Sequence, residues 1–459
     1  MNGTGGPTAP VSAFGRARRL FDDLLHGTSD QRTAQRGAVT AFLVRIASAA
    51  LLYLSQIVLA RWMGSFEYGV YVFVWTWVLV LGGLANLGMA TLMIRLVPEY
   101  RERAQWDLLR GLLSTGRWLA VAAATLVALV ALTALTYAGH LLSSYYVLPA
   151  FIALACVPMV TLSDVQDCIG RGRGWIAAAL LPPYVLRPLL VLLAMIVAHE
   201  LGWPMSAVTA AGAAVIGTWA AAIVQTLLIQ RRLRADVPPG PSVRTLRPWL
   251  GTSLPLLAIT FSEILLQTTD VLVISQLMTP RDVAIYFAAA KTMSLIMFVH
   301  YAVGSAMANR FALLNARGDR DGLRQAVREA VNWTFWPSLV AAGAILVLGQ
   351  PLLWLFGPQF TDGYPVMLVL VVGFLGRAAT GPSEFLLNML GQQRTTAVVA
   401  VGMALLNIAL NLMLVPRFGL MGGAMSTATA LLGGALLNTI VARRRLGFDI
   451  AIWSNLHRA

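Results

Sequence analysis

The sequence is poor in the residue types on which metal sites and disulfide frameworks depend. It has two cysteines, Cys156 and Cys168, and five histidines among 459 residues. Two cysteines cannot build a disulfide framework or a cysteine-based metal cluster, and the histidines lack the spacing of metal ligands. We therefore expect no metal and no cofactor.

Charge is also scarce, while apolar residues are abundant. Only 12% of the residues are charged and 58% are hydrophobic, with a mean hydropathy of +0.71. A soluble domain of this length does not need so much apolar surface, whereas a membrane protein must present it to lipid and to neighbouring helices. The N-terminus lacks the features of a cleaved signal peptide, so the first membrane helix is expected to target the chain.

Twelve apolar stretches have about the length that an α-helix needs to cross a bilayer, roughly 20 residues. We place them at 38–60, 70–94, 118–138, 147–163, 176–198, 205–229, 253–275, 284–308, 333–355, 365–388, 396–414 and 421–441. The sequence thus predicts an all-α polytopic membrane protein with about twelve transmembrane helices.

The basic residues fall on alternate connections between these spans. Of the 34 Lys and Arg residues, 27 lie on one side, 3 on the other, and 4 inside spans. This asymmetry follows the positive-inside rule and predicts that both termini are cytoplasmic in a bacterial inner membrane. The net charge of +14 is then explained by span ends that face anionic lipid, and nucleic acid is not an expected partner.

Short matches between the two halves of the chain indicate an internal repeat. Met63–Tyr71 aligns with Met278–Tyr286, Gly170–Arg173 with Gly391–Arg394, and Arg231–Leu233 with Arg444–Leu446, at similar offsets. Because each half has six spans, both halves enter from the cytoplasm and form a parallel pseudo-repeat of two six-helix lobes.

The repeat divides the chain into five parts. They are a cytoplasmic N-terminal segment (1–37) that is either an amphipathic helix or a basic tail, an N-lobe (38–236), a linker (237–252), a C-lobe (253–442) and a cytoplasmic tail (443–459). In proteins built from such repeats, the substrate site lies between the lobes near mid-depth.

Charged residues inside spans are the strongest candidates for function, because burying them in a membrane is costly. Arg187 and Arg377 lie near the middle of their spans, where snorkelling to a surface is difficult. Each is expected to face a cavity, although Arg377 has an alternative partner in Glu384, seven residues later on the same helix face. Arg45 is closer to the cytoplasmic edge and could either snorkel or contribute to the cavity.

Further polar residues cluster on the seventh and eighth spans. Glu263, Gln267 and Asp270 are spaced to share one helix face, which indicates either a cavity lining that couples an ion or proton, or helix–helix pairing. Lys291 is a further candidate cavity residue that could pair with Asp270.

The chain resembles the polysaccharide transporter family, the Wzx-type flippases of the multidrug/oligosaccharidyl-lipid/polysaccharide exporter superfamily. The segments that carry the resemblance are Leu59–Tyr71, Leu186–Leu190, Asp270–Met278 and Asn407–Gly419. The resemblance implies two lobes in a V that flip an undecaprenyl-pyrophosphate-linked oligosaccharide for surface or exopolysaccharide biosynthesis. It also implies cationic residues in the central cavity, a role that we match to Arg187 and Arg377.

Alternating access is the expected mechanism, with Arg187, Arg377, Arg45 and Lys291 as candidate ligands of the pyrophosphate and glycan. The expected partners are the lipid-linked oligosaccharide, the bilayer, and a polysaccharide polymerase with its assembly proteins. A cation-coupled multidrug exporter and a lipid II flippase are the alternatives. An enzyme is not expected, because every predicted outer loop is too short to hold a catalytic domain.

Overall fold

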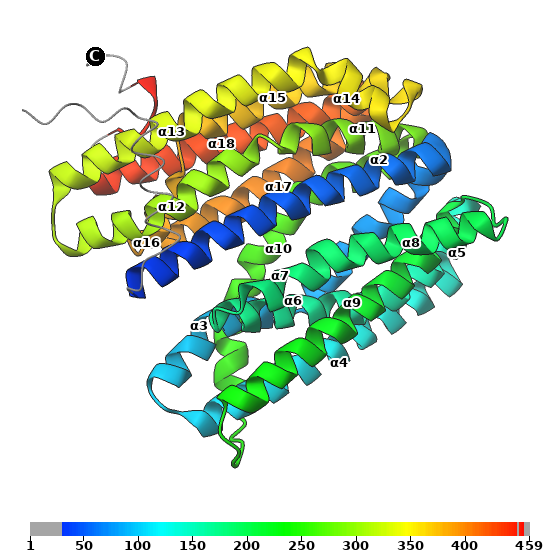
Figure 1. Cartoon of the computed structure of the whole chain (residues 1–459). Helices are drawn as coiled ribbons and strands as arrows, with labels where there is room; N and C mark the ends of the chain where they lie inside the picture. Colours follow the sequence, from blue (N-terminus) through cyan, green and yellow to red (C-terminus); the bar gives the residue numbers. More distant parts are fainter. Residues whose placement is uncertain (1–29, 448, 454–459) are drawn as a thin grey trace, which may run out of the picture.

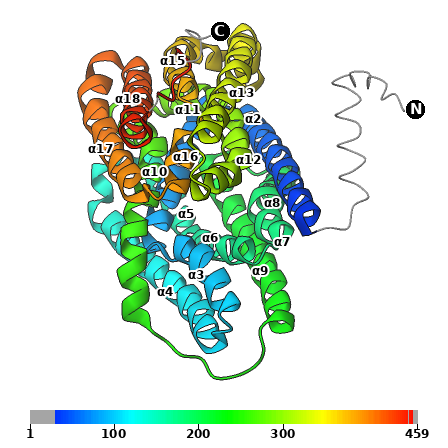
Figure 2. The same ribbon diagram turned by 90° about the vertical axis from the view of Figure 1, so that its left-hand side faces the viewer.

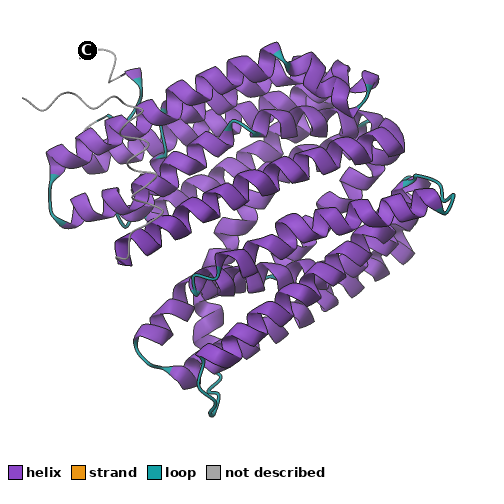
Figure 3. Ribbon diagram, viewed as in Figure 1, coloured by secondary structure: helices purple, strands orange, loops and turns teal. Residues whose placement is uncertain are grey.

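The computed structural model describes residues 30–447 and 449–453, with the backbone alone for residues 30–46 and Leu141. Helices account for nearly all of this part, and no strand occurs in it (Figure 3). The all-α prediction is therefore confirmed. The expected amphipathic segment 1–37 lies largely outside the described residues, so its two interpretations stay open.

The helices of the first half of the chain are often interrupted by kinks or short 3-10 and π segments. They are α2 (Asp30–Ala85), α3 (Met89–Glu102), α4 (Trp106–Ala138), η1 (Gly139–Leu141), α5 (Ser144–Ala153), η2 (Leu154–Cys156), α6 (Val157–Gly172), α7 (Ile176–Leu181), η3 (Pro182–Leu186), α8 (Arg187–Glu200) and α9 (Ala207–Asp236).

The helices of the second half of the chain also differ widely in length. They are α10 (Leu246–Leu277), α11 (Pro280–Ser294), α12 (Met297–Ala316), α13 (Arg320–Val347), α14 (Gly349–Phe356), η4 (Pro358–Gly363), α15 (Tyr364–Ala379), α16 (Ser383–Met389), α17 (Gln393–Phe418) and α18 (Leu420–Leu446).

Eleven helical stretches of the described residues are long and apolar enough to cross a membrane. The first of them contains two helices, because α2 is kinked at Gly64, where φ is 74° and ψ is 168°. The predicted spans 38–60 and 70–94 lie on either side of this kink, and each of the other ten predicted spans overlaps a different stretch. Two predicted ends are wrong: 70–94 runs past Ala85 into α3, and 333–355 runs past Val347 into α14. The chain is a multi-pass membrane protein.

The helices gather into two bundles (Figure 1). One bundle contains α3 to α9, and the other contains α11 to α18. The first part of α2 runs along the second bundle, and α10 passes between the two (Figures 1 and 2). The predicted boundaries of the lobes stay a prediction, but the contacts of α2 and α10 cross them.

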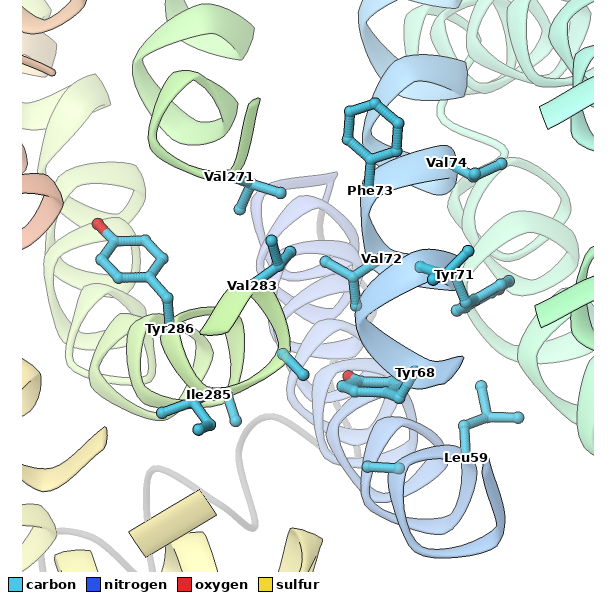
Figure 4. Close-up of a cluster of buried hydrophobic side chains, with 14 of the residues drawn as sticks. Leu59, Tyr68, Tyr71, Val72, Phe73, Val74, Val271, Val283, Ile285 and Tyr286 are labelled. Atoms are coloured by element: carbon cyan, nitrogen blue, oxygen red, sulfur yellow. The ribbon is translucent and has the colours of Figure 1, made fainter. Parts of the chain in front are cut away.

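The largest buried cluster joins the two halves of the sequence. Tyr68 and Val72 of α2 lie beside Val271 of α10 and Val283 of α11, and Val72 and Val283 point toward one another (Figure 4). Glycines allow the backbones to approach here: a Cβ on Gly69 would lie 1.7 Å from the carbonyl oxygen of Pro280. Close van der Waals packing of these side chains holds the bundles together at this contact.

Candidate functional site

The first charged cluster lies in the first half of the chain, where α6 faces the helix break before α8. Pro182–Leu186 forms one turn of π-helix, and Arg187 begins α8 directly after it. Proline at 182 and 183 removes two backbone donors, which favours such a break, and π turns often occur at functional sites. The break fixes the position of Arg187 near the middle of the span Ile176–Glu200.

Arg187 differs from Arg171, the other basic residue of this cluster, in its lack of a salt bridge within the described residues. Its guanidinium lies over the ring of Trp75, 5.4 Å from the ring centroid. It is within electrostatic range of Asp164, but within the described residues it forms no salt bridge. Its side chain is partly exposed, so it can still accept an anionic ligand.

Two acidic residues that the sequence analysis missed complete the first cluster. Asp167 is buried and forms a salt bridge of 2.8 Å with Arg171, one turn later on α6. Asp164 is exposed and lies within electrostatic range of Asp167, Arg171 and Arg187. The predicted span ended at residue 163, so these residues were assigned to a cytoplasmic connection, whereas α6 continues to Gly172. The i, i+4 spacing of Asp167 and Arg171 was the available signal.

The second charged cluster is built from α10, α12, α15 and α16. Arg377, near the end of α15, forms a 2.7 Å salt bridge with Glu384 of α16. Glu263 of α10 is exposed and lies within electrostatic range of both. His300 and Tyr301 of α12 lie within range of Arg377. Of the two interpretations of Arg377, its pairing with Glu384 is the one that the structure contains.

Asp270 forms a separate network on α10, two turns after Glu263. Its carboxylate accepts hydrogen bonds from the Tyr286 hydroxyl (2.5 Å), from Asn411 Nδ2 (2.7 Å) and from the Thr427 hydroxyl. Asn411 also contacts Asn407 Oδ1, and its own Oδ1 is buried without a partner in the described part of the chain. A buried carboxylate whose partners are uncharged hydroxyl and amide groups can hold a proton or a small hard cation.

Lys291 does not pair with Asp270, contrary to one expectation from the sequence. Neutral donors of α11, α17 and α18 surround the carboxylate, and Lys291 lies five residues after Tyr286, on another face of α11. Its ammonium lies 5.3 Å from the centroid of the Phe287 ring and is exposed. Gln267 is exposed as well, and the side chain of Arg45 lies outside the described residues.

Several of these charged groups are exposed although they lie inside membrane spans. Asp164, Glu263 and Lys291 have exposed side chains in the spans Ser144–Gly172, Leu246–Leu277 and Pro280–Ala316. Exposure of a charge to hydrocarbon is costly, so we infer that these groups face water between the helices. Within the described residues, no group of three or more His, Cys, Asp or Glu side chains could hold a metal ion, and Cys156 and Cys168 are buried free thiols.

A family model described as polysaccharide biosynthesis protein matches residues 34–308, more than half of the chain. The chain belongs to this family. A second family model, MatE, matches residues 255–413. Both matches confirm the resemblance to polysaccharide transporters that the sequence motifs indicated. No curated protein matched the chain.

Solved structures share the fold of this polysaccharide biosynthesis family member. A multidrug resistance MATE transporter of the MOP superfamily in an inward-facing conformation is 16% identical, with a TM-score of 0.66 over 94% of this chain and 97% of that one. The lipid II flippase MurJ, in an inward closed conformation, is 14% identical, with a TM-score of 0.68 over 88% and 87%. A MOP superfamily transporter from Pyrococcus furiosus is 16% identical, with a TM-score of 0.62 over 93% and 97%.

Proposed function

We propose that this transporter flips an undecaprenyl-pyrophosphate-linked oligosaccharide from the cytoplasmic to the outer side of a bacterial inner membrane by alternating access. The observation that carries the proposal is Arg187, a mid-span arginine that has no salt bridge within the described residues. A planar guanidinium binds phosphate oxygens in pairs, so Arg187 suits the pyrophosphate. The family match supports a substrate of polysaccharide biosynthesis.

In this proposal, Arg377 binds the same anion only after its present partner has been displaced. In the structure it is occupied by Glu384, and Glu263 adds a second negative charge nearby. A pyrophosphate must therefore displace Glu384 before it can bind Arg377. This exchange would transfer the head group between the halves of the chain, while the polyprenyl tail stays in lipid. Lys291 and Arg45 are kept as proposed further ligands of the anion.

Asp270 is the proposed coupling group. Its hydrogen-bonding partners are neutral, and Asn411 Oδ1 is free to face a cation or a protonated carboxyl group. A proton or cation that enters at Asp270 would stabilise one of the two conformations of the transporter. Glu263 and Gln267 are exposed on the same helix, and in this proposal they line the route to Asp270.

The membrane potential contributes to the driving force without any coupling ion. Moving one elementary charge through 100 mV is worth about 2.3 kcal/mol, so two negative charges that leave a negative interior gain roughly 4–5 kcal/mol. This gain favours outward flipping of a pyrophosphate. Ion entry at Asp270 would add to it.

The proposal is tested by reconstituting the purified protein in liposomes with a fluorescent polyprenyl-pyrophosphate-linked oligosaccharide. We expect flipping by the wild-type protein and strongly reduced flipping by Arg187→Ala, with equal amounts of both proteins inserted. The same assay with polyprenyl monophosphate measures how far the second phosphate is required. Equal flipping by wild type and Arg187→Ala would contradict the assignment.

A cation-coupled exporter is the second candidate function, because two carboxylates, Glu263 and Glu384, lie near the single Arg377. This excess of carboxylates over arginine favours a cationic substrate in the second half of the chain. Uptake of cationic dyes into inverted vesicles distinguishes the two functions: we expect no dye transport. Lipid II in the flipping assay tests the remaining alternative, a lipid II flippase.

A further inference from the structure

The first helix of α2 is held by helices from the other half of the sequence. The Tyr53 hydroxyl hydrogen-bonds to the Thr292 hydroxyl of α11 at 2.8 Å, and its ring contacts Phe356 of α14 edge to face. Arg61 donates to the carbonyl oxygens of Leu355 (2.8 Å) and Trp354 (2.9 Å) at the end of α14. Its guanidinium also lies 4.5 Å from the Trp354 ring centroid. This helix is therefore built into the bundle of α11 to α18 (Figure 1).

The second helix of α2 is anchored in the first bundle directly after the kink. Glu67 Oε2 accepts a hydrogen bond of 2.7 Å from the backbone amide of Ala207, at the start of α9. Phe73 packs on Tyr146 of α5, and Gly82 lies against Thr161 of α6. Arg61 and Glu67 thus fasten the two helices of α2 to two different bundles, with Gly64 between them.

Helix α10 also contacts both bundles, but it begins in the bundle of the first half of the chain and ends in the other bundle. Its first turns are built into the bundle of α3 to α9: Trp249 is buried among Met93, Leu109 and Leu112, and its Nε1 donates to the Tyr100 hydroxyl at 3.1 Å. The linker before it is fixed as well, because Arg110 of α4 donates to the carbonyl oxygens of Pro238 and Pro241. The later turns of α10 belong to the other bundle, through Asp270 and its partners on α17 and α18.

Each crossing helix has a feature that allows it to bend between its two anchors. In α2 the feature is Gly64, whose φ of 74° favours glycine. In α10, Pro255 interrupts the helical hydrogen bonds, and Thr260 and Ser262 hydrogen-bond back to carbonyl oxygens one turn earlier. Proline and such Ser and Thr side chains bend helices.

We propose that the two bodies that move during transport are not the two halves of the sequence. One body consists of residues 66–254, and the other consists of residues 47–63 and 264–446. The hinges are Gly64 and residues 255–263. Alternating access then slides Gly69, Val72 and Gly83 of the first body past Pro280, Val283 and Ile264 of the second, contacts that small side chains keep close.

This assignment goes beyond the proposed function and gives α10 a mechanical role. Glu263 lies at the hinge, and Asp270 lies two turns further into the second body. An ion or proton that binds there acts on the helix that connects both bodies. In the alternative, with lobes at 38–236 and 253–442, the same site would lie wholly inside one lobe.

Two neighbouring residues on the first helix of α2 contact different halves of the chain, so crosslinks at these two positions should have opposite effects. Arg61 contacts Trp354 of the second half, whereas Trp62 stacks on His199 of the first half, with ring centroids 6.1 Å apart. All four side chains are exposed. We would prepare two full-length double variants, Arg61→Cys with Trp354→Cys and Trp62→Cys with His199→Cys, and crosslink both with one short thiol-specific reagent. The wild-type chain, with its buried native cysteines, controls for background reaction.

The proposal predicts that the crosslink between positions 61 and 354 leaves flipping at the rate of the uncrosslinked variant, because both positions lie in one body. The crosslink between positions 62 and 199 joins the two bodies and should stop flipping. Moving lobes at 38–236 and 253–442 predict the reverse. Loss of flipping in both variants, or in neither, also overturns the assignment.

A distance measurement keeps this test independent of the substrate. Spin labels at exposed positions, Leu54 on α2 and Leu254 on α10, are each paired with Leu126 on α4 and Val340 on α13. Whenever the Leu126–Val340 distance shifts, the pairs Leu54–Val340 and Leu254–Leu126 should stay constant, and the other two should shift. The opposite pattern overturns the two bodies even if the substrate is a different lipid. If flipping fails but these distances behave as expected, the proposed substrate is wrong and the two bodies stand.

Discussion

The two charged clusters of the transporter differ in how their arginines are used. In the first half of the chain, two carboxylates and two guanidinium groups balance, and Asp167 pairs with Arg171, so Arg187 is left without a salt bridge in the described structure. In the second half, Glu263 and Glu384 outnumber Arg377, and Glu384 occupies it. On our proposal, the first cluster can bind an anion directly, while the second must exchange a partner before it can bind one.

Asp270 sharpens this contrast. The second half contains a buried carboxylate whose hydrogen-bond partners are all neutral, a feature suited to a proton or cation. We therefore propose different roles for the two halves of the chain. The first half binds the anionic head group, and the second half couples ion entry to movement.

Replacing Arg187 should have the largest effect. Arg187→Ala removes two charge-assisted hydrogen bonds to the pyrophosphate, worth about 3 kcal/mol together, or roughly 100-fold in affinity. The measurement is titration of flipping with the labelled lipid-linked substrate. Arg187→Lys is the matched control: it keeps the charge but not the paired hydrogen bonds, and should flip at an intermediate rate. Full activity of Arg187→Ala would remove the first half as the anion site.

Asp270→Asn should have the next largest effect, on coupling. The amide cannot take up a proton or balance a cation, so we expect flipping to lose its dependence on the ion or pH gradient while the response to membrane potential remains. The measurement is flipping in liposomes with each gradient imposed separately. Asp270→Glu keeps the charge and should keep the gradient dependence. A variant Asp270→Asn that still responds to every gradient would exclude the coupling role.

Glu384→Gln should have a moderate effect, and it should strengthen substrate binding where Arg187→Ala weakens it. It releases Arg377, so the affinity for the pyrophosphate should rise, by about tenfold if one charge-assisted hydrogen bond of roughly 1.5 kcal/mol becomes available. Turnover should slow, because the anion is then released less readily. Equilibrium binding and flipping rate are measured on the same preparations. In Arg377→Ala the Glu384→Gln substitution should have no further effect on affinity, and an equal gain there would contradict the exchange.

Trp75→Leu should have the smallest effect. The ring of Trp75 lies below the guanidinium of Arg187, and such contacts contribute about 0.5–1 kcal/mol, a two- to fivefold change in affinity. Trp75→Phe keeps an aromatic face and should lose less. Substrate titration measures both. If Trp75→Leu were as damaging as Arg187→Ala, the tryptophan would itself bind the substrate.

The sequence predicted the features that depend on composition and on short spacings. Apolar length located the membrane spans, and the position of Arg187 and Arg377 within their spans marked them as unusual, because hydrocarbon penalises any charge that it surrounds. The seven-residue spacing also offered the pairing of Arg377 with Glu384 as an alternative. The pair forms, but not on one helix face as expected, because α15 ends at Ala379 and Glu384 lies on α16. Asp164 and Asp167 were missed because α6 extends beyond the apolar stretch that marked its span.

The tertiary structure decided which groups meet across long sequence separations. Asp270 finds Asn411 and Thr427 rather than Lys291, and the first helix of α2 joins the other half of the chain through Arg61 and Trp354. Hydropathy and charge along the chain fix how deep each residue lies in the membrane, because lipid acts on each helix separately. They do not fix how a helix is rotated or which neighbour it packs on, since these depend on side-chain packing and hydrogen bonds between helices.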